Sequence, residues 1–353
     1  MMPSATAFGA SVDYADRRWQ IWRTRADGEV TLLAQDPEAR PTFRRVSWDS
    51  VTPCSTPAVG PSRAEEMLQR FHQQSRAAES DNARHLKKVE VRWLREGPPS
   101  ELTASAPGSR VGYVVATLCP MTRGHLAMAQ AAVQDLDLDA VYFMVWPFTY
   151  IRGFHSSPLE PWAARQQHLD WPLRMQIARR SIADFGDTRI RLLEAAQDWY
   201  GESSRMYSRK DPSSVYWTGT WYVTRKLKFW LERVTPGPFA HYAVCGTEQL
   251  ARDVAVLVEG TADRLAWSTY SIAHHLTLHS VYASPRPIQR EGVEAFAPPE
   301  GAANDVIFGS ETPMSRMCAT DVRFGTMPPA PLDELVMPGA AALIRGNGWW
   351  GYN

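Results

Sequence analysis

The chain has 353 residues, and its 38 Lys and Arg balance its 38 Asp and Glu, so the formal net charge is zero. That balance excludes a global field that would recruit nucleic acid or an anionic membrane surface, so any phosphate site must be local. Hydrophobic residues make up 44% and charged residues 22% of the chain. These fractions are typical of a soluble globular protein, and no apolar run approaches the length of a membrane-spanning helix.

The cysteines and the N-terminus predict a cytoplasmic location. Cys54, Cys119, Cys245 and Cys318 are far apart and form no CxxC pair, so we expect free thiols in a reducing compartment. The first ten residues, MMPSATAFGA, lack a basic start followed by an apolar core, so we expect no secretory signal.

Residues 1–108 are expected to form a separate, small α+β unit of unknown role. Residues 18–34 alternate apolar and polar side chains around an Asp-Gly pair, which predicts a β-hairpin. A serine at position 62 predicts the N-cap of a helix over residues 63–76, and residues 81–95 continue as helix or strand. The stretch GPPSELTASAPG (97–108) is expected to be a linker.

From residue 109 to residue 353 the pattern predicts an α/β fold with a Rossmann-like parallel sheet and helices on both faces, because apolar strands alternate with amphipathic helices. Strands are expected near residues 111–115, 141–145, 189–193, 241–246 and 280–283. Helices are expected near residues 124–134, 173–185 and 221–234, with a short helical stretch inside 331–350.

The stretch RVGYVVATLCPMTRGHL (110–126) combines a buried strand, a tight turn and a helix start. Open α/β sheets bind ligands beyond the carboxyl ends of their strands. Backbone N–H groups in the first turn of a helix have no intrahelical partner and carry a partial positive charge, so an anion fits there. Together with Thr122 and His125, this turn is suited to the phosphates of a nucleotide.

Several segments, in order, resemble a known family. TLCPMTRGH resembles the HxGH or TxxH signature of the nucleotidyltransferase superfamily, and MCATDVR (317–323) resembles its second signature, ISSTxxR. Between and after them, YWTGTWYVTRKL, VCGTEQL, VYASPRP and LVMPGAAALIRGNGWWG are similar to further elements of the family. The group with the closest features is the nicotinamide or nicotinate mononucleotide adenylyltransferases. The resemblance covers most of residues 110–353 and none of residues 1–108.

This resemblance implies an enzyme that transfers AMP from ATP to a small phosphorylated acceptor, a pyridine mononucleotide, and releases pyrophosphate in NAD biosynthesis. Such a transfer depends on positioning and charge neutralisation more than on covalent chemistry by the protein. The implied cofactor is Mg²⁺, bound through the nucleotide phosphates and water with few or no protein ligands. A homo-oligomer is left open, and no nucleic-acid or membrane partner is expected.

The resemblance also implies roles for individual residues. His125 would donate to phosphate oxygens and Arg323 would bind the β- and γ-phosphates, with Thr122 as the third catalytic residue. The implied nucleotide-binding residues are Thr117, Leu118, Gly124, Gly246, Glu248, Cys318, Ala319 and Thr320. The implied acceptor-binding residues are Arg174, Glu194, Trp217, Thr218 and Thr220.

Some positions differ from the family pattern and keep alternatives open. Cys119 stands for the usual Asp or Asn, Cys318 and Ala319 stand for serines, and Glu248 stands for Asp. One alternative is therefore a nucleotidyltransferase with another acceptor or nucleotide in a specialised biosynthetic pathway. The other is a nucleotide-binding regulatory module with reduced catalysis.

Individual residues also have structural interpretations. Arg174 could form a structural ion pair, and Trp217 could belong to the core. His275 and His279 fall on one helical face beside His274, which suggests zinc, but no Cys or carboxylate nearby completes a ligand set, so this interpretation is disfavoured.

Overall fold

The centre of the molecule is a six-stranded, fully parallel sheet. In this computed structural model the described residues are 8–34, 42–54, 62–103, 110–146, 169–207, 212–235, 237–259, 272–285, 293–324 and 330–352. The strands are β6 (Arg110–Ala116), β7 (Ala140–Val145), β8 (Ile190–Leu192), β9 (Ala240–Gly246), β10 (Ser280–Ser284) and β11 (Val306–Phe308). Their order is β11-β10-β9-β6-β7-β8. The chain first adds β7 and β8 on one side of β6 and then adds β9, β10 and β11 on its other side, so the order of strands switches between β6 and β9. This is the order of a doubly wound Rossmann-like fold, so the predicted fold class is confirmed.

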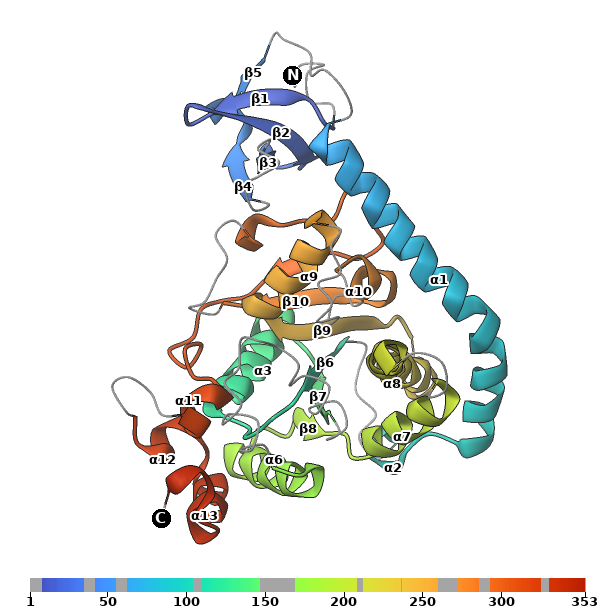
Figure 1. Cartoon of the computed structure of the whole chain (residues 1–353), viewed down its shortest axis with the longest axis vertical. Coiled ribbons are helices and arrows are strands. Elements are labelled where there is room, and N and C mark those ends of the chain that lie inside the picture. The colour runs from blue at the N-terminus through green and yellow to red at the C-terminus, as the bar shows by residue number, and fades with distance from the viewer. Residues whose placement is uncertain are drawn as a thin grey trace.

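Helices cover both faces of this sheet (Figure 1). One face packs against α3 (Arg123–Leu136) and α6 (Trp171–Phe185). The other face packs against α7 (Ala196–Tyr207), α8 (Pro212–Val234), α9 (Thr247–Glu259) and α10 (Ile272–Leu278). The helix predicted over residues 221–234 is α8, which begins nine residues earlier than predicted, at Pro212.

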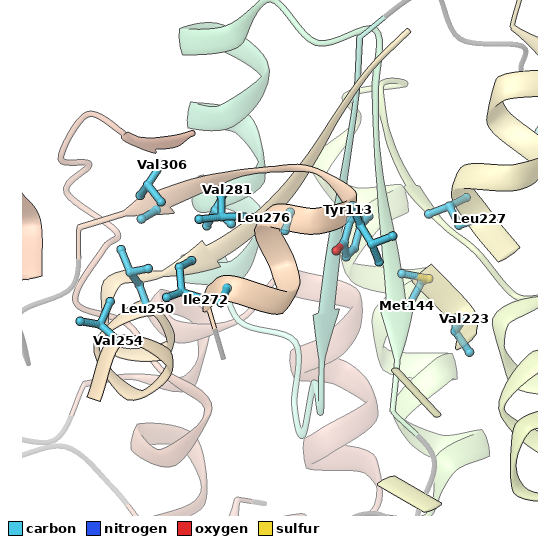
Figure 2. Packing of buried hydrophobic residues seen from close by; sticks show 14 of the residues in the cluster. Tyr113, Met144, Val223, Leu227, Leu250, Val254, Ile272, Leu276, Val281 and Val306 are labelled. Atoms are coloured by element: carbon cyan, nitrogen blue, oxygen red, sulfur yellow. The ribbon is translucent and has the colours of Figure 1, made fainter. Parts of the chain in front are cut away.

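Successive side chains of each strand point to opposite faces of the sheet, as expected for a β-strand. Val114 and Phe143 point toward α3 and α6. Tyr113, Met144 and Val281 lie on the other face, where Figure 2 shows them packed with residues of α8, α9 and α10. The strands are therefore buried on both sides, which explains why they are apolar without alternation.

The N-terminal part is a five-stranded antiparallel sheet followed by one long helix. The strands are β1 (Ser11–Tyr14), β2 (Arg17–Thr24), β3 (Glu29–Ala34), β4 (Phe43–Ser47) and β5 (Thr52–Pro53), in the order β4-β3-β2-β1-β5. The predicted hairpin is β2 and β3, and Ser62 caps α1 (Arg63–Glu96) in a capping box with Glu65.

The helix α1 runs 20 residues beyond the predicted end at residue 76, through residues 81–95. The helix contacts α9 and α10, where Ser75 lies beside Ala273, and contacts α8 near its end through Trp93. These contacts support its length, because tertiary packing stabilises helices more than local propensity does. The expected linker contains a short helix, α2 (Ser100–Thr103), and residues 104–109 lie outside the described residues. The boundary near residue 108 stays a prediction.

One hydrophobic cluster joins the N-terminal part to the parallel sheet. It contains Trp22 and Phe43 from the small sheet, Trp93 from α1 and Tyr113 from β6. The Trp22 indole N–H donates to the Ala297 carbonyl over 2.6 Å, and the Trp93 indole N–H donates to the hydroxyl of a tyrosine in α8 over 2.7 Å.

The C-terminal segment lies beyond α6, at the carboxyl side of the sheet (Figure 1). It consists of α11 (Ala319–Phe324), α12 (Leu332–Leu335), α13 (Pro338–Gly346) and the 3₁₀ turn η3 (Trp349–Gly351). Two other 3₁₀ turns lie outside this segment, η1 (Trp48–Ser50) and η2 (Val293–Ala295). Within the described parts of the chain, no helix combines the length and apolar character needed to cross a bilayer.

Candidate functional site

The site is built on the turn between β6 and α3. Leu118 in this turn has a left-handed backbone with φ of +48°, and Thr122 is the N-cap of α3 in extended geometry. The pairing of Tyr113 with Ala243 sets the ends of β6 and β9 at the same level along the sheet. The turn therefore lies where the strand order reverses, which is the point where doubly wound sheets bind ligands.

His125, in the first turn of α3, is oriented by Thr122. The Thr122 backbone N–H donates to His125 Nδ1 over 3.1 Å, and Thr122 Oγ1 lies 2.8 Å from the same nitrogen. Because Nδ1 accepts a backbone hydrogen bond, the neutral imidazole carries its proton on Nε2. Thr122 itself is fully buried. The pair thus presents an Nε2–H donor at the positive end of α3.

Arg323, on α11, joins the two signature segments. Its Nη1 donates to the carbonyl oxygen of Cys119, a contact between residues 204 positions apart in the chain. The side chain is buried, with 8% of the residue exposed. The preceding residue, Val322, packs in the cluster formed by α11, α12 and α13. The fold therefore brings Arg323 to the same turn that orients His125.

Arg174, on α6, binds the same turn from another side. Its Nη1 donates to the carbonyls of Thr117 and Trp146 over 2.6 and 2.7 Å, and its Nε donates to the Leu169 carbonyl over 3.0 Å. Burial lowers the pKa of this guanidinium to about 10, so it stays protonated at neutral pH. The Arg174 guanidinium is thus held by backbone carbonyls, with a Coulombic attraction to Asp170, and among the described residues its Nη2 has no hydrogen-bond partner. The side chain holds the ends of β6 and β7 together.

Gly246 and Glu248 meet at the neighbouring strand end. A Cβ atom added to Gly246 would lie 2.1 Å from Glu248 Oε2, so the glutamate carboxylate folds over this glycine and would have to move to admit a larger residue. Glu194 follows β8 and forms an exposed pair with Arg179 across 2.5 and 2.7 Å. The hydrogen bond from Arg179 holds the pKa of the Glu194 carboxyl below its usual value.

The remaining predicted residues are placed as follows. Gly124 is buried in the first turn of α3. The Cys318 N–H donates to the Asp321 carboxylate over 2.9 Å at the start of α11, where Ala319 is half-buried and Thr320 is exposed. Burial raises the pKa of the Cys119 and Cys318 thiols. Trp217, Thr218 and Thr220 lie in α8, and their side chains are outside the described residues.

The histidines for which zinc was the disfavoured interpretation belong to a hydrogen-bond network instead. His275 Nδ1 lies 3.2 Å from His279 Nε2, which lies 2.7 Å from the Tyr113 hydroxyl, and His275 Nε2 lies 3.4 Å from Asp253. Within the described chain, no group of three or more His, Cys, Asp or Glu side chains could hold a metal ion.

Sequence reasoning missed Arg123, which stands inside the TRGH stretch. Its Nε donates to the carbonyls of Asp333 and Val336, both over 3.1 Å. The acceptors are backbone atoms more than 200 positions away, so no spacing or residue type in the sequence could have indicated this contact.

No family model matches the chain, and no curated protein sequence matches it. Among solved structures, it is similar to nicotinic acid mononucleotide adenylyltransferase of Plasmodium falciparum, complexed with APC (10% identity) or with NaAD (12% identity). Each comparison has a TM-score of 0.40 and covers 69% of this chain and 98% of the other.

Proposed function

We propose that this chain is a nucleotidyltransferase that transfers AMP from ATP to a phosphorylated acceptor and releases pyrophosphate. The observation that carries the proposal is the hydrogen bond from Arg323 to the Cys119 carbonyl, which brings α11 to the turn that orients His125. The acceptor that the sequence resemblance favours is a nicotinamide or nicotinate mononucleotide.

The charges around the turn suit a polyphosphate. Arg174 and Arg323 are both buried guanidinium groups on carbonyls of this one turn, and His125 presents Nε2–H beside them. The N-terminus of α3 adds partial positive charge. This concentration of positive charge suits a ligand with several phosphates. Arg174 contributes its charge while its Nη1 and Nε stay on backbone carbonyls, and arginine such as Arg323 can bind phosphate oxygens directly.

In the proposed reaction, a phosphate oxygen of the acceptor attacks the α-phosphorus of ATP. A new P–O bond forms, the bond from the α-phosphorus to the bridging oxygen breaks, and pyrophosphate leaves with that oxygen. His125 donates through Nε2–H to the charge that develops on the phosphates, and Arg323 binds the leaving pyrophosphate. Thr122 orients the imidazole, and Arg174 holds the turn.

Mg²⁺ is part of the proposal. The donors at the turn are cationic or N–H groups, which suit phosphate oxygens and not a metal ion. Mg²⁺ would therefore be held by the nucleotide phosphates and water, where it neutralises phosphate charge.

The other implied residues keep proposed roles. Gly246 ends β9, the strand beside β6, and Glu248 lies in the first turn of α9, a placement that suits contact with the nucleoside part of ATP. Trp217 would stack on a pyridine ring through its aromatic face. The further nucleotide-binding residues are Thr117, Leu118, Gly124, Cys318, Ala319 and Thr320, and the further acceptor-binding residues are Glu194, Thr218 and Thr220.

The test is pyrophosphate release with Mg²⁺, each nucleoside triphosphate and a panel of phosphorylated acceptors. We expect release with ATP and a pyridine mononucleotide, and none after chelation of Mg²⁺. His125→Ala should lower turnover by about 100-fold or more, since it removes a donor to transition-state charge. His72→Ala, an exposed histidine on α1, should leave turnover unchanged. ATP binding without release for any acceptor would instead support the regulatory alternative.

A further inference from the structure

Arg123 connects the helix that carries His125 to the segment that carries Arg323. It is the first residue of α3, and its Nε binds the carbonyl oxygens of Asp333 and Val336 over 3.1 Å each. Asp333 is the second residue of the four-residue helix α12, and Val336 is its C-cap. The last four carbonyls of a helix lack intrahelical partners and carry partial negative charge. A cationic side chain is suited to that position.

The segment α11–α13 is held together by one hydrophobic cluster, which also includes Ile177 of α6. Val322 of α11 packs with Leu332 and Leu335 of α12 and with Ile344 of α13, all nearly fully buried. A shift of α12 would therefore carry α11, and Arg323 with it, in the same direction. The position of α12 relative to α3 thus affects the distance between the two proposed catalytic groups.

The two segments contact each other reciprocally. Arg323 reaches from α11 to the Cys119 carbonyl in the turn, while Arg123 reaches from α3 to the carbonyls of α12. Two contacts in opposite directions fix the separation of the segments better than one contact does. This precision matters because a misplacement of about 1 Å can lower turnover by about 100-fold.

We propose that Arg123 is a positioning residue, which sets the separation between the His125 imidazole and the Arg323 guanidinium through the carbonyls of Asp333 and Val336. The proposal rests on the proposed function, since it assigns both groups to one polyphosphate ligand.

The test compares Arg123→Met, Arg123→Lys and the matched control Arg345→Met. Arg345 binds the same α12 through the Asp333 carboxylate, over 3.0 and 2.5 Å, but from α13 within the segment. We expect Arg123→Met to lower kcat for pyrophosphate release tenfold or more with less than a threefold change in acceptor KM. Arg123→Lys should restore most of kcat, and Arg345→Met should stay within twofold of the unchanged protein. Equal kcat values for Arg123→Met and Arg345→Met would overturn the proposal.

Calorimetric binding of inorganic tripolyphosphate with Mg²⁺ separates this inference from the proposed function. Weaker binding by Arg123→Met, tenfold or more, with unchanged binding by Arg345→Met would support the inference even if no acceptor gives turnover. Tripolyphosphate binding that is absent from the unchanged protein, or equal in both variants, would overturn it. If Arg123→Met does not fold, the same comparison is made between Arg123→Lys, for which we expect an intermediate affinity, and Arg345→Met. Equal affinity of these two would again overturn the inference.

Discussion

Replacement of Lys226 by methionine should be among the most destabilising single changes in this chain. Lys226 is 2% exposed, and its Nζ lies 2.6 Å from Glu96 and 2.9 Å from Glu202. These residues join α1, α7 and α8. Although burial alone would raise the pKa of Glu96, hydrogen bonds from Lys226 and Arg92 hold that pKa below its usual value.

The magnitude follows from which carboxylate loses its partner. The Glu96 side chain is 32% exposed and can be hydrated, whereas the Glu202 side chain is 9% exposed and, among the described residues, would keep the hydroxyl of Tyr222 at 2.7 Å. Leaving one buried charge unpaired costs about 3–5 kcal/mol. Replacing both charges, as in Lys226→Met with Glu202→Gln, should recover most of that loss, because a buried ion pair contributes little relative to neutral side chains.

The assay is urea unfolding followed by tryptophan fluorescence, with the single and double variants compared in one cycle. Arg189→Met is the control, since Arg189 forms an ion pair with Asp187 at the surface. This variant should lose less than about 1 kcal/mol of its free energy of unfolding. A loss for Lys226→Met no larger than that of the control would refute the reasoning, as would a double variant less stable than Lys226→Met.

Two further predictions concern the sheet. Burial and the charge of Lys228 lower the pKa of His241 to about 3, so below pH 6.5 the unfolded chain binds a proton that the folded chain does not. The free energy of unfolding should therefore fall as the pH falls from 6.5 toward 3, by about 2 kcal/mol at pH 5. In urea unfolding curves measured across this pH range, His241→Phe should reduce the dependence of the free energy of unfolding on pH, and the control His72→Phe should leave it unchanged. Gly112→Ala should lower the free energy of unfolding by about 1–3 kcal/mol, and the urea midpoint with it, because the new Cβ would lie 2.9 Å from Leu138 and 3.1 Å from Val244. An unchanged midpoint would contradict that packing.

The central sheet could be predicted because its signal is local. β6 is a mostly apolar run in which three of the seven residues are valine, and Thr122 is a favoured N-cap residue three positions before His125. The length of α1 could not be predicted in this way. Its middle, around Asp81 and Asn82, has weak helical propensity, and contacts with helices far along the chain decide the outcome.

The candidate site likewise has a part that the sequence could predict and a part that it could not. Imidazole, hydroxyl and guanidinium groups are visible in a sequence, so His125, Thr122 and Arg323 could be selected by their resemblance to a known pattern. The acceptors that hold Arg123, Arg174 and Arg323 are backbone carbonyls. Every residue has such a carbonyl, so only the fold determines which ones an arginine reaches.

The contact between Trp22 and Ala297 has a consequence for synthesis on the ribosome. The two residues are 275 positions apart, and the hairpin that carries Trp22 is translated first. At about 5–20 residues per second, the partner segment appears roughly 15–55 seconds later. During that interval Trp22 and Phe43 have not yet reached their burial against the later chain, so the nascent hairpin is a candidate client for chaperones that bind apolar surface.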